Sequence, residues 1–534
     1  MNLLEDLNIE TSGLQSNWHG LIRNSFVYLS GGTMRSAGDD LILELFREIF
    51  FEKRSEGSID RPVDPEIMEG GSFLLSEHER YSLYMSKGRK KQGAQQRKES
   101  NFYTPLYPSL ARYSWFRKPS ERVTRDFFLR PLAQHIHGIR NADSQNISES
   151  ISIFLHAMIG SKRGEEDIAA LQIDPLLGCN GQSNEDKIQK ALERLEDLCG
   201  VMSDKSNSIN NKSGSEKYDT IFTYSDGSSD PLADRIFNDL VYLCRLESKI
   251  DRIQWIGLFK TFLRVSSSVW LLAQMRMTIY LRDHLLECLC NDAYNDSGEE
   301  FEIKIKNRYR KIFRATTGKT RQIENSIQNY IKARTEVNIL LTLIEKYSPL
   351  DLSRKKLTLN SDSSTTASVD FLTRATRESR NLILKNTSLE KDAFRLSLSR
   401  YCERFPSWLE GVPAKKGPAK GYEEYLLMLR KMNKGDEDGG YLVVAGKQKN
   451  MGYELFPGNL LLKLITFLSS RECQNRRLVL ADVESHFSGY GIDFGEVGGM
   501  RPRLIESLSK LGILQGSSDA GVSALIYNPY RGFK

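Results

Sequence analysis

The chain carries near its C-terminus the sequence Pro457-Gly-Asn-Leu-Leu-Leu-Lys-Leu-Ile-Thr-Phe-Leu468. The Pro-Gly-Asn tripeptide breaks any preceding strand and offers an N-cap, which favours a helix starting directly after it. The apolar residues that follow recur at helical spacing, at Leu460, Leu461, Leu464, Ile465 and Leu468. This stretch therefore predicts an amphipathic helix with a sharply defined start.

Two more helices and two hairpins are predicted around this helix. Apolar residues at helical spacing, the proline Pro502 in the first turn and the glycine Gly512 after the last turn favour a third helix. The predicted strands cover 441–445 and 453–456, the second and third helices cover 480–487 and 501–511, and the closing hairpin covers 513–527. Hairpin, three helices and hairpin is the plan of a winged-helix domain, which we expect over 441–534.

Winged helices bind DNA or another protein. In the DNA-binding form the third helix enters the major groove and the hairpin contacts the backbone. Here that helix presents Arg501, Arg503 and Lys510 to solvent, with Glu506 among them. We predict the three cations as nucleic-acid contacts, with protein docking as the alternative use of the same helix.

A second source of positive charge precedes this domain. Cationic side chains crowd residues 304–321, with Tyr309 and Phe313 between them, and phosphate binding needs such cations along one track. The alternative is a solvated helix face balanced by nearby acidic residues. We predict as candidate nucleic-acid contacts Lys304, Lys306, Arg308, Arg310, Lys311 and Arg314. A smaller basic cluster covers residues 87–98.

Composition sets outer limits on the function. The 534 residues are 40% hydrophobic and carry a net charge of +6, which permits nucleic-acid binding without requiring it. Seven scattered cysteines with no CxxC pair argue against a disulfide framework or a zinc site and favour a cytoplasmic protein. A basic N-terminal region and an apolar run of about 18 residues are both missing, so we expect neither a signal peptide nor a membrane partner.

The rest of the chain is predicted to be mainly α, a multi-helix body preceding the winged helix. Residues 230–347 have helical patterning throughout, with one or two long helices in 253–290. Serine-rich and basic Pro/Gly-rich stretches mark the breaks. The predicted units are an N-terminal helical domain (1–202), a polar linker (203–229), a central helical domain (230–410) with a polar loop near 352–369, a basic linker with a helix (411–440), and the winged helix (441–534).

Catalytic residues, metal ligands and cofactors are not predicted. His135 and His137 would share a face only in a strand, and their surroundings are helix-patterned. Asp239, Glu247 and Lys249 resemble the carboxylate–carboxylate–lysine set of metal-dependent nucleases, whose members must lie on adjacent strands. Since residues 240–250 are also helix-patterned, a nuclease with a degenerate site is an alternative function.

The C-terminal residues resemble a class of bacterial proteins. The segments that carry the resemblance are Gly458-Asn-Leu-Leu-Leu462, Tyr490-Gly-Ile-Asp493, Arg501-Pro-Arg-Leu-Ile505 and Ser518-Asp-Ala-Gly521. They are similar to accessory subunits of anti-phage defence or DNA-processing systems, which accompany ATPase or helicase partners. The resemblance implies a non-catalytic subunit that binds double-stranded DNA or serves as an adaptor for a separate ATPase, helicase or nuclease. A kleisin-like structural linker is a further alternative.

Overall fold

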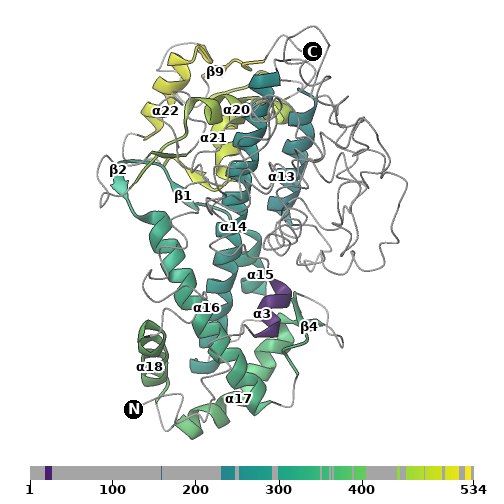
Figure 1. Ribbon diagram of the computed structural model, residues 1–534, viewed down its shortest axis with the longest axis vertical. Helices are drawn as coiled ribbons and strands as arrows, with labels where there is room; N and C mark the ends of the chain where they lie inside the picture. Colours follow the sequence, from purple (N-terminus) through teal and green to yellow (C-terminus); the bar gives the residue numbers. More distant parts are fainter. Residues whose placement is uncertain are drawn as a thin grey trace, which may run out of the picture.

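The computed structural model describes residues 19–26, 158, 230–246, 250, 252–291, 299–348, 351–359, 363, 366–387, 390–404, 442–444, 453–473, 476–495, 500–515 and 524–530. Helices dominate this part of the chain (Figure 1), which confirms the mainly-α class. Apart from residues 19–26 and 158, the predicted N-terminal domain lies outside the described residues. So do the predicted linkers at 203–229 and 411–440 and the basic cluster at 87–98.

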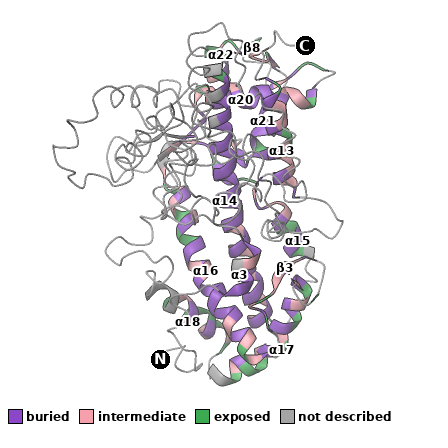
Figure 2. Cartoon of the chain, turned by 45° about the vertical axis from the view of Figure 1, so that its right-hand side comes forward, coloured by how far each residue is buried: buried purple, intermediate pink, exposed green. Residues whose placement is uncertain are grey.

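One long helix organises the described part of the molecule. α14 (Arg252–Cys290) has 39 residues, which corresponds to about 58 Å at 1.5 Å per residue. Every residue from 261 to 275 is buried (Figure 2), as expected for a helix that is covered on all sides. The first half of α14 lies in one hydrophobic core and the second half in another. We call them the upper core and the lower core, after their places in Figure 1.

The upper core joins central helices to the C-terminal segments. α13 (Pro231–Cys244) and the first half of α14 contribute Leu240, Trp255 and Phe262, all of them buried. The C-terminal helices and strands contribute a similar number of apolar side chains to the same core, among them Leu464 and Leu504. The residues predicted to form a winged helix are therefore packed directly on α13 and α14.

The lower core is built from helices and one small parallel sheet. It contains the second half of α14 and buried residues of seven further elements. These are α3 (Gly20–Ser25), α15 (Glu299–Lys306), α16 (Gln322–Tyr347), α17 (Val369–Thr387) and α18 (Lys391–Arg404), with the sheet strands β3 (Lys356–Thr358) and β4 (Thr366–Ser368). The two strands pair in parallel within the predicted polar loop, with the buried residues Leu357 and Ala367 opposite each other. Each strand has only three residues, which is too short for an alternating pattern to predict the pair from the sequence.

The C-terminal elements follow the predicted order closely. The three helices each begin within one residue of the predicted start. The elements are β5 (Val443–Val444), β6 (Tyr453–Leu455), α20 (Asn459–Ser469), the 3-10 helix η9 (Ser470–Cys473), α21 (Leu480–Gly489), β7 (Ile492–Asp493), α22 (Met500–Lys510), β8 (Leu514–Gln515) and β9 (Leu525–Ile526). β8 pairs antiparallel with β9, as expected for a hairpin, and Val479 forms an antiparallel bridge to Leu525 on the other side of β9.

The structure corrects the helical prediction for residues 313–320. They form two strands, β1 (Phe313–Arg314) and β2 (Thr316–Thr320). β1 pairs in parallel with β7, and β2 pairs antiparallel with β6. Threonine is β-branched and favours strands. The hydrogen-bonding partners come from much later in the chain, so local periodicity could not indicate them.

A buried carboxylate fastens the C-terminal elements to α13. Asp239 is fully buried and accepts a hydrogen bond of 2.8 Å from the hydroxyl of Tyr490. His486 Nε2 lies 3.0 Å from the same carboxylate oxygen, and the guanidinium of Arg471 lies 3.3 Å from the other. Burial and the Asp239 charge raise the pKa of Tyr490 well above its usual value, which keeps this donor protonated. We call these four residues the Asp239 cluster.

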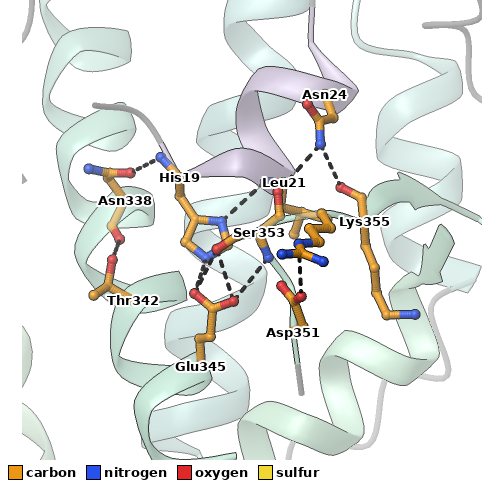
Figure 3. Close-up of polar contacts among 10 residues, drawn as sticks. His19, Leu21, Asn24, Asn338, Thr342, Glu345, Asp351, Ser353 and Lys355 are labelled. Carbon is orange, nitrogen blue, oxygen red and sulfur yellow. Dashed lines mark hydrogen bonds and ion pairs between the residues drawn. The ribbon is translucent and has the colours of Figure 1, made fainter. Parts of the chain in front are cut away.

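A second carboxylate fastens α3 to the lower core (Figure 3). Glu345 of α16 lies 3.1 Å from His19 Nε2 and accepts hydrogen bonds from the backbone N–H and the hydroxyl of Ser353. The backbone N–H of His19 donates to the side chain of Asn338 at 2.6 Å. The side chain of Asn24 reaches the carbonyl of Ser353 at 3.4 Å. Residues 19–26 are therefore held by polar contacts as well as by the apolar side chains that they add to the lower core.

Candidate nucleic-acid interface

The cations predicted on α22 are each paired with a carboxylate. Arg501 contacts Glu484 through Nε at 2.7 Å and Nη2 at 3.2 Å. Lys510 Nζ lies 2.6 Å from the carboxylate of Glu506, one turn earlier on the same helix. The positive charge of each side chain is thereby balanced at short range.

Arg503 is held on two sides. Its guanidinium forms an ion pair with Glu454 of β6, and its Cζ lies 4.2 Å from the ring centroid of Phe456. Ion pairing combined with a cation–π contact restricts the side chain to one position. Arg503 thus joins α22 to the sheet formed by β2, β6 and β5.

Three cations at the start of the predicted basic cluster are also paired with carboxylates. Lys304 pairs with Glu300 at 2.6 Å and Lys306 pairs with Glu302 at 3.2 Å. Arg308 is only 1% exposed, forms an ion pair with Asp230 and lies over the ring of Trp270 at 5.4 Å. The structure therefore places Arg308, which we predicted as a surface contact, inside the protein.

The remaining three predicted contacts are different. Arg310, Lys311 and Arg314 are all exposed. Across the described ranges, none of them has a carboxylate oxygen within 4.0 Å of its side-chain nitrogens. They lie in residues 307–314, the segment that follows α15 and ends with β1, which we call the basic turn. Among the described residues, its three exposed cations carry positive charge that no ion pair balances.

The backbone of the basic turn is fixed by a partly buried arginine. Arg276 of α14 donates hydrogen bonds to the carbonyls of Arg308 at 3.0 Å, Arg310 at 2.6 Å and Lys311 at 3.0 Å. Burial lowers the pKa of Arg276, yet an arginine stays charged at neutral pH. An arginine within the largely apolar run 268–277 was the signal in the sequence that could have indicated a fixed polar contact at this place.

Hydrogen bonds to two partners outside the turn, Gly491 and Gln322, fix its last residues. Phe313 N–H donates to the carbonyl of Gly491 at 2.9 Å, and the side chain of Gln322 bonds both the N–H and the carbonyl of Arg314. Gly491 has a φ of 71°, and a Cβ there would lie 2.1 Å from the carbonyl oxygen of Tyr309. Only glycine permits this close approach, so the turn rests directly on the C-terminal elements.

The basic turn and α22 are connected through neighbouring strands. β1 pairs with β7, which precedes α22, and β2 pairs with β6, whose Glu454 binds Arg503. Figure 1 shows β1, β2 and α22 on the same side of α14. The structure thus brings together two groups of predicted contacts that are far apart in the sequence.

The described residues contain little that suggests catalysis. Asp239, the first member of the nuclease-like set, lies on a helix and is enclosed by its three donors, while Glu247 and Lys249 lie outside the described residues. His135 and His137 lie outside them too. Within the part that the structure describes, no group of three or more His, Cys, Asp or Glu is arranged to hold a metal ion.

No protein-family model, curated protein or solved structure matches the chain. None of the described helices has both the length and the apolar character needed to cross a bilayer.

Proposed function

We propose that this chain is a non-catalytic DNA-binding subunit, and an adaptor, of a bacterial anti-phage defence complex that also contains a separate ATPase, helicase or nuclease. The observation that carries the DNA-binding part is the arrangement of elements from α20 to β9. The defence setting rests on the resemblance of the segments around 458–462, 490–493, 501–505 and 518–521 to accessory subunits of such systems.

The arrangement supports a winged helix. In that fold a short strand between the first two helices joins the hairpin that follows the third helix. Here Val479 lies between η9 and α21 and bridges to Leu525. The neighbouring N–H of Leu480 donates to the carbonyl of Ala524, and Ile526 N–H donates to the carbonyl of Leu478, both at 2.9 Å. Helix, strand, helix, helix and hairpin thus occur in the order that the fold requires.

The charge of the molecule agrees with this proposal. A net charge of +6 is modest for a chain of this length, and much of the positive charge near α22 is balanced by carboxylates. A protein with few free cations neutralises few phosphates, so it binds DNA with moderate affinity, and this affinity still falls as salt rises because each neutralised phosphate releases counterions. We therefore expect binding that is clear at low salt and weak at physiological salt.

The experiment is a fluorescence-anisotropy titration of the full chain with a labelled DNA duplex over a salt series. We expect binding whose affinity falls steeply between about 50 and 200 mM salt. Absence of binding at the lowest salt would overturn the DNA-binding function.

A parallel incubation tests the non-catalytic part of the proposal. The same duplex is incubated with the protein and Mg²⁺ and then resolved on a denaturing gel. Intact DNA is the expected result. Cleavage that is lost on Glu247→Ala would replace the proposal with a metal-dependent nuclease, the function for which a carboxylate at this position would be needed.

A further inference from the structure

We propose that the basic turn is the site that contacts the DNA phosphates, through Arg310, Lys311 and Arg314, and that the cations of α22 stabilise their own domain instead. This inference rests on the proposed DNA-binding function and identifies its contact surface. It reverses the expectation for a winged helix, in which the third helix carries the main contacts.

The cations of α22 and those of the basic turn differ in how far nearby carboxylates balance their charge. On α22, Arg501, Arg503 and Lys510 are matched by three carboxylates at hydrogen-bonding distance. A phosphate that approached these cations would meet the paired acidic groups as well. The three exposed cations of the basic turn have no carboxylate oxygen within 4.0 Å among the described residues. Asp493 lies opposite Arg314 in the β1–β7 pair, so an approaching phosphate meets an excess of positive charge there.

The basic turn is also rigid. Arg276 holds three carbonyls of its backbone, and Gln322 holds the backbone of Arg314. Lys311 has a φ of 51°, an unusual backbone conformation for a residue other than glycine. A surface whose backbone is already ordered loses only side-chain freedom when a ligand binds, which reduces the entropic cost of association.

The distance spanned by the three cations of the basic turn suits neighbouring phosphates on one DNA strand. Residues 310–314 span four peptide units, at most about 14 Å when extended. Three flexible cationic side chains on such a segment match two or three neighbouring phosphates along one strand. Contacts of this kind position a protein on DNA and carry no sequence information. We therefore expect binding at this site to be independent of the DNA sequence.

The test compares two variants that each lose three positive charges. The first is Arg310→Gln, Lys311→Gln and Arg314→Gln in the basic turn. The matched control is Lys304→Gln, Lys306→Gln and Lys510→Gln, because these lysines are paired with carboxylates on their own helices. Both variants are titrated with two duplexes of unrelated sequence over a salt series. Circular dichroism and thermal unfolding verify that each variant is folded.

We expect the basic-turn variant to bind roughly 100-fold more weakly at low salt, since each lost phosphate contact reduces the slope of log K against log salt by about 0.9. Its slope should therefore fall by about 2 to 3, while the control keeps the slope of the unmodified protein. The two duplexes should bind alike.

Two results would overturn the inference, and they differ in what they say about the proposed function. If the basic-turn variant binds like the unmodified protein, or the control loses as much affinity as it does, the contact surface lies elsewhere while DNA binding stands. If the unmodified protein does not bind either duplex, both the inference and the DNA-binding function are wrong.

Discussion

Asp239 in the upper core and Glu345 at the lower core perform similar structural tasks in different surroundings. Each is a carboxylate that gathers several donors and fastens a distant segment of the chain to a helix. Asp239 is fully buried, whereas the side chain of Glu345 is 28% exposed. Water can replace part of what Glu345 loses if its partners leave, but it cannot reach Asp239. The same chemistry should therefore contribute unequally to stability.

Asp239 and Glu345 also differ in the segments of the chain that they hold in place. The Asp239 cluster joins α13 to η9 and α21, so it fixes the C-terminal elements on which the basic turn rests. The Glu345 contacts hold only α3 and the residues before β3. Loss of the first should disturb the upper core and the basic turn that rests on it. Loss of the second should stay local.

The largest effect is expected for Asp239→Ala. Removing one partner from a buried ion pair leaves polar groups without compensation, and we expect the unfolding free energy to fall by about 3 kcal/mol. The measurement is the urea midpoint followed by circular dichroism. Asp239→Asn is the control, because an amide oxygen still accepts the hydrogen bond from Tyr490, and it should cost less. If the unfolding free energy falls no further in Asp239→Ala than in Glu345→Ala, the two carboxylates do not contribute unequally to stability.

The C-terminal helices and the Asp239 cluster show how much of the fold could be predicted from the sequence. The three C-terminal helices were predicted to within one residue at their starts, because each carries its own apolar stripe and its own stop signal. Asp239 was noted only as a possible nuclease residue. Its partners His486 and Tyr490 lie in another predicted domain, and local patterning cannot show that two such residues meet.

The charged residues teach the same lesson about the candidate interface. Composition identified the basic cluster, but it could not separate the exposed Arg310 from the buried Arg308, two residues earlier. The difference depends on Asp230, the N-cap of α13, and on Trp270 of α14. Burial and ion pairing are set by tertiary contacts, so predictions of contact residues from charge alone identify the region better than the residue.

The second largest effect is expected for Gly20→Ala in α3. A Cβ at this position would lie 1.6 Å from the backbone carbonyl oxygen of Ser353, so the helix must move away. Overpacking of this kind costs about 1–3 kcal/mol. Hydrogen exchange should show faster exchange of the amides in 19–26 and of Leu357, whose N–H donates to Ser25 Oγ.

Gly257→Ala is the matched control for this prediction. It lies on α14, and its Cβ would meet only a side-chain carbon of Leu460 at an ordinary 3.5 Å. Alanine favours a helix over glycine by about 1 kcal/mol, so this variant should be neutral or slightly more stable. Unchanged exchange at 19–26 in Gly20→Ala would show that α3 is not held against Ser353.

A smaller effect is expected for Glu345→Gln. The amide keeps one oxygen for Ser353 but loses its charge toward His19, and solvent screens this partly exposed site. We expect the unfolding free energy to fall by about 1 kcal/mol. The urea midpoint measures the change, and faster exchange should be limited to 19–26 and the residues near 353. Faster exchange at the Asp239 cluster would contradict the separation of the Asp239 and Glu345 contacts.

The smallest effect is a dependence of stability on pH that passes through His19. Burial lowers the pKa of His19 below its usual value of 6.5, although Glu345 opposes this shift. In the unfolded chain the imidazole takes up its proton near pH 6.5, while in the folded chain it does so only at lower pH. The unfolded state then binds more protons, so the unfolding free energy falls as pH drops below 6.5, by at most about 1.4 kcal/mol per pH unit.

The pKa of Glu345 depends partly on His19. Burial would raise this pKa, but the hydrogen bonds from Ser353, together with the contact to His19, outweigh burial and hold it below its usual value of 4.5. Its contribution is therefore complete above pH 4.5 and is lost only as pH falls through its lower folded value. Urea midpoints between pH 7 and pH 5, compared between the unmodified protein and His19→Gln, isolate the histidine. The variant should have a flatter profile over this range, because glutamine does not titrate; identical slopes would show that His19 takes up its proton equally in both states.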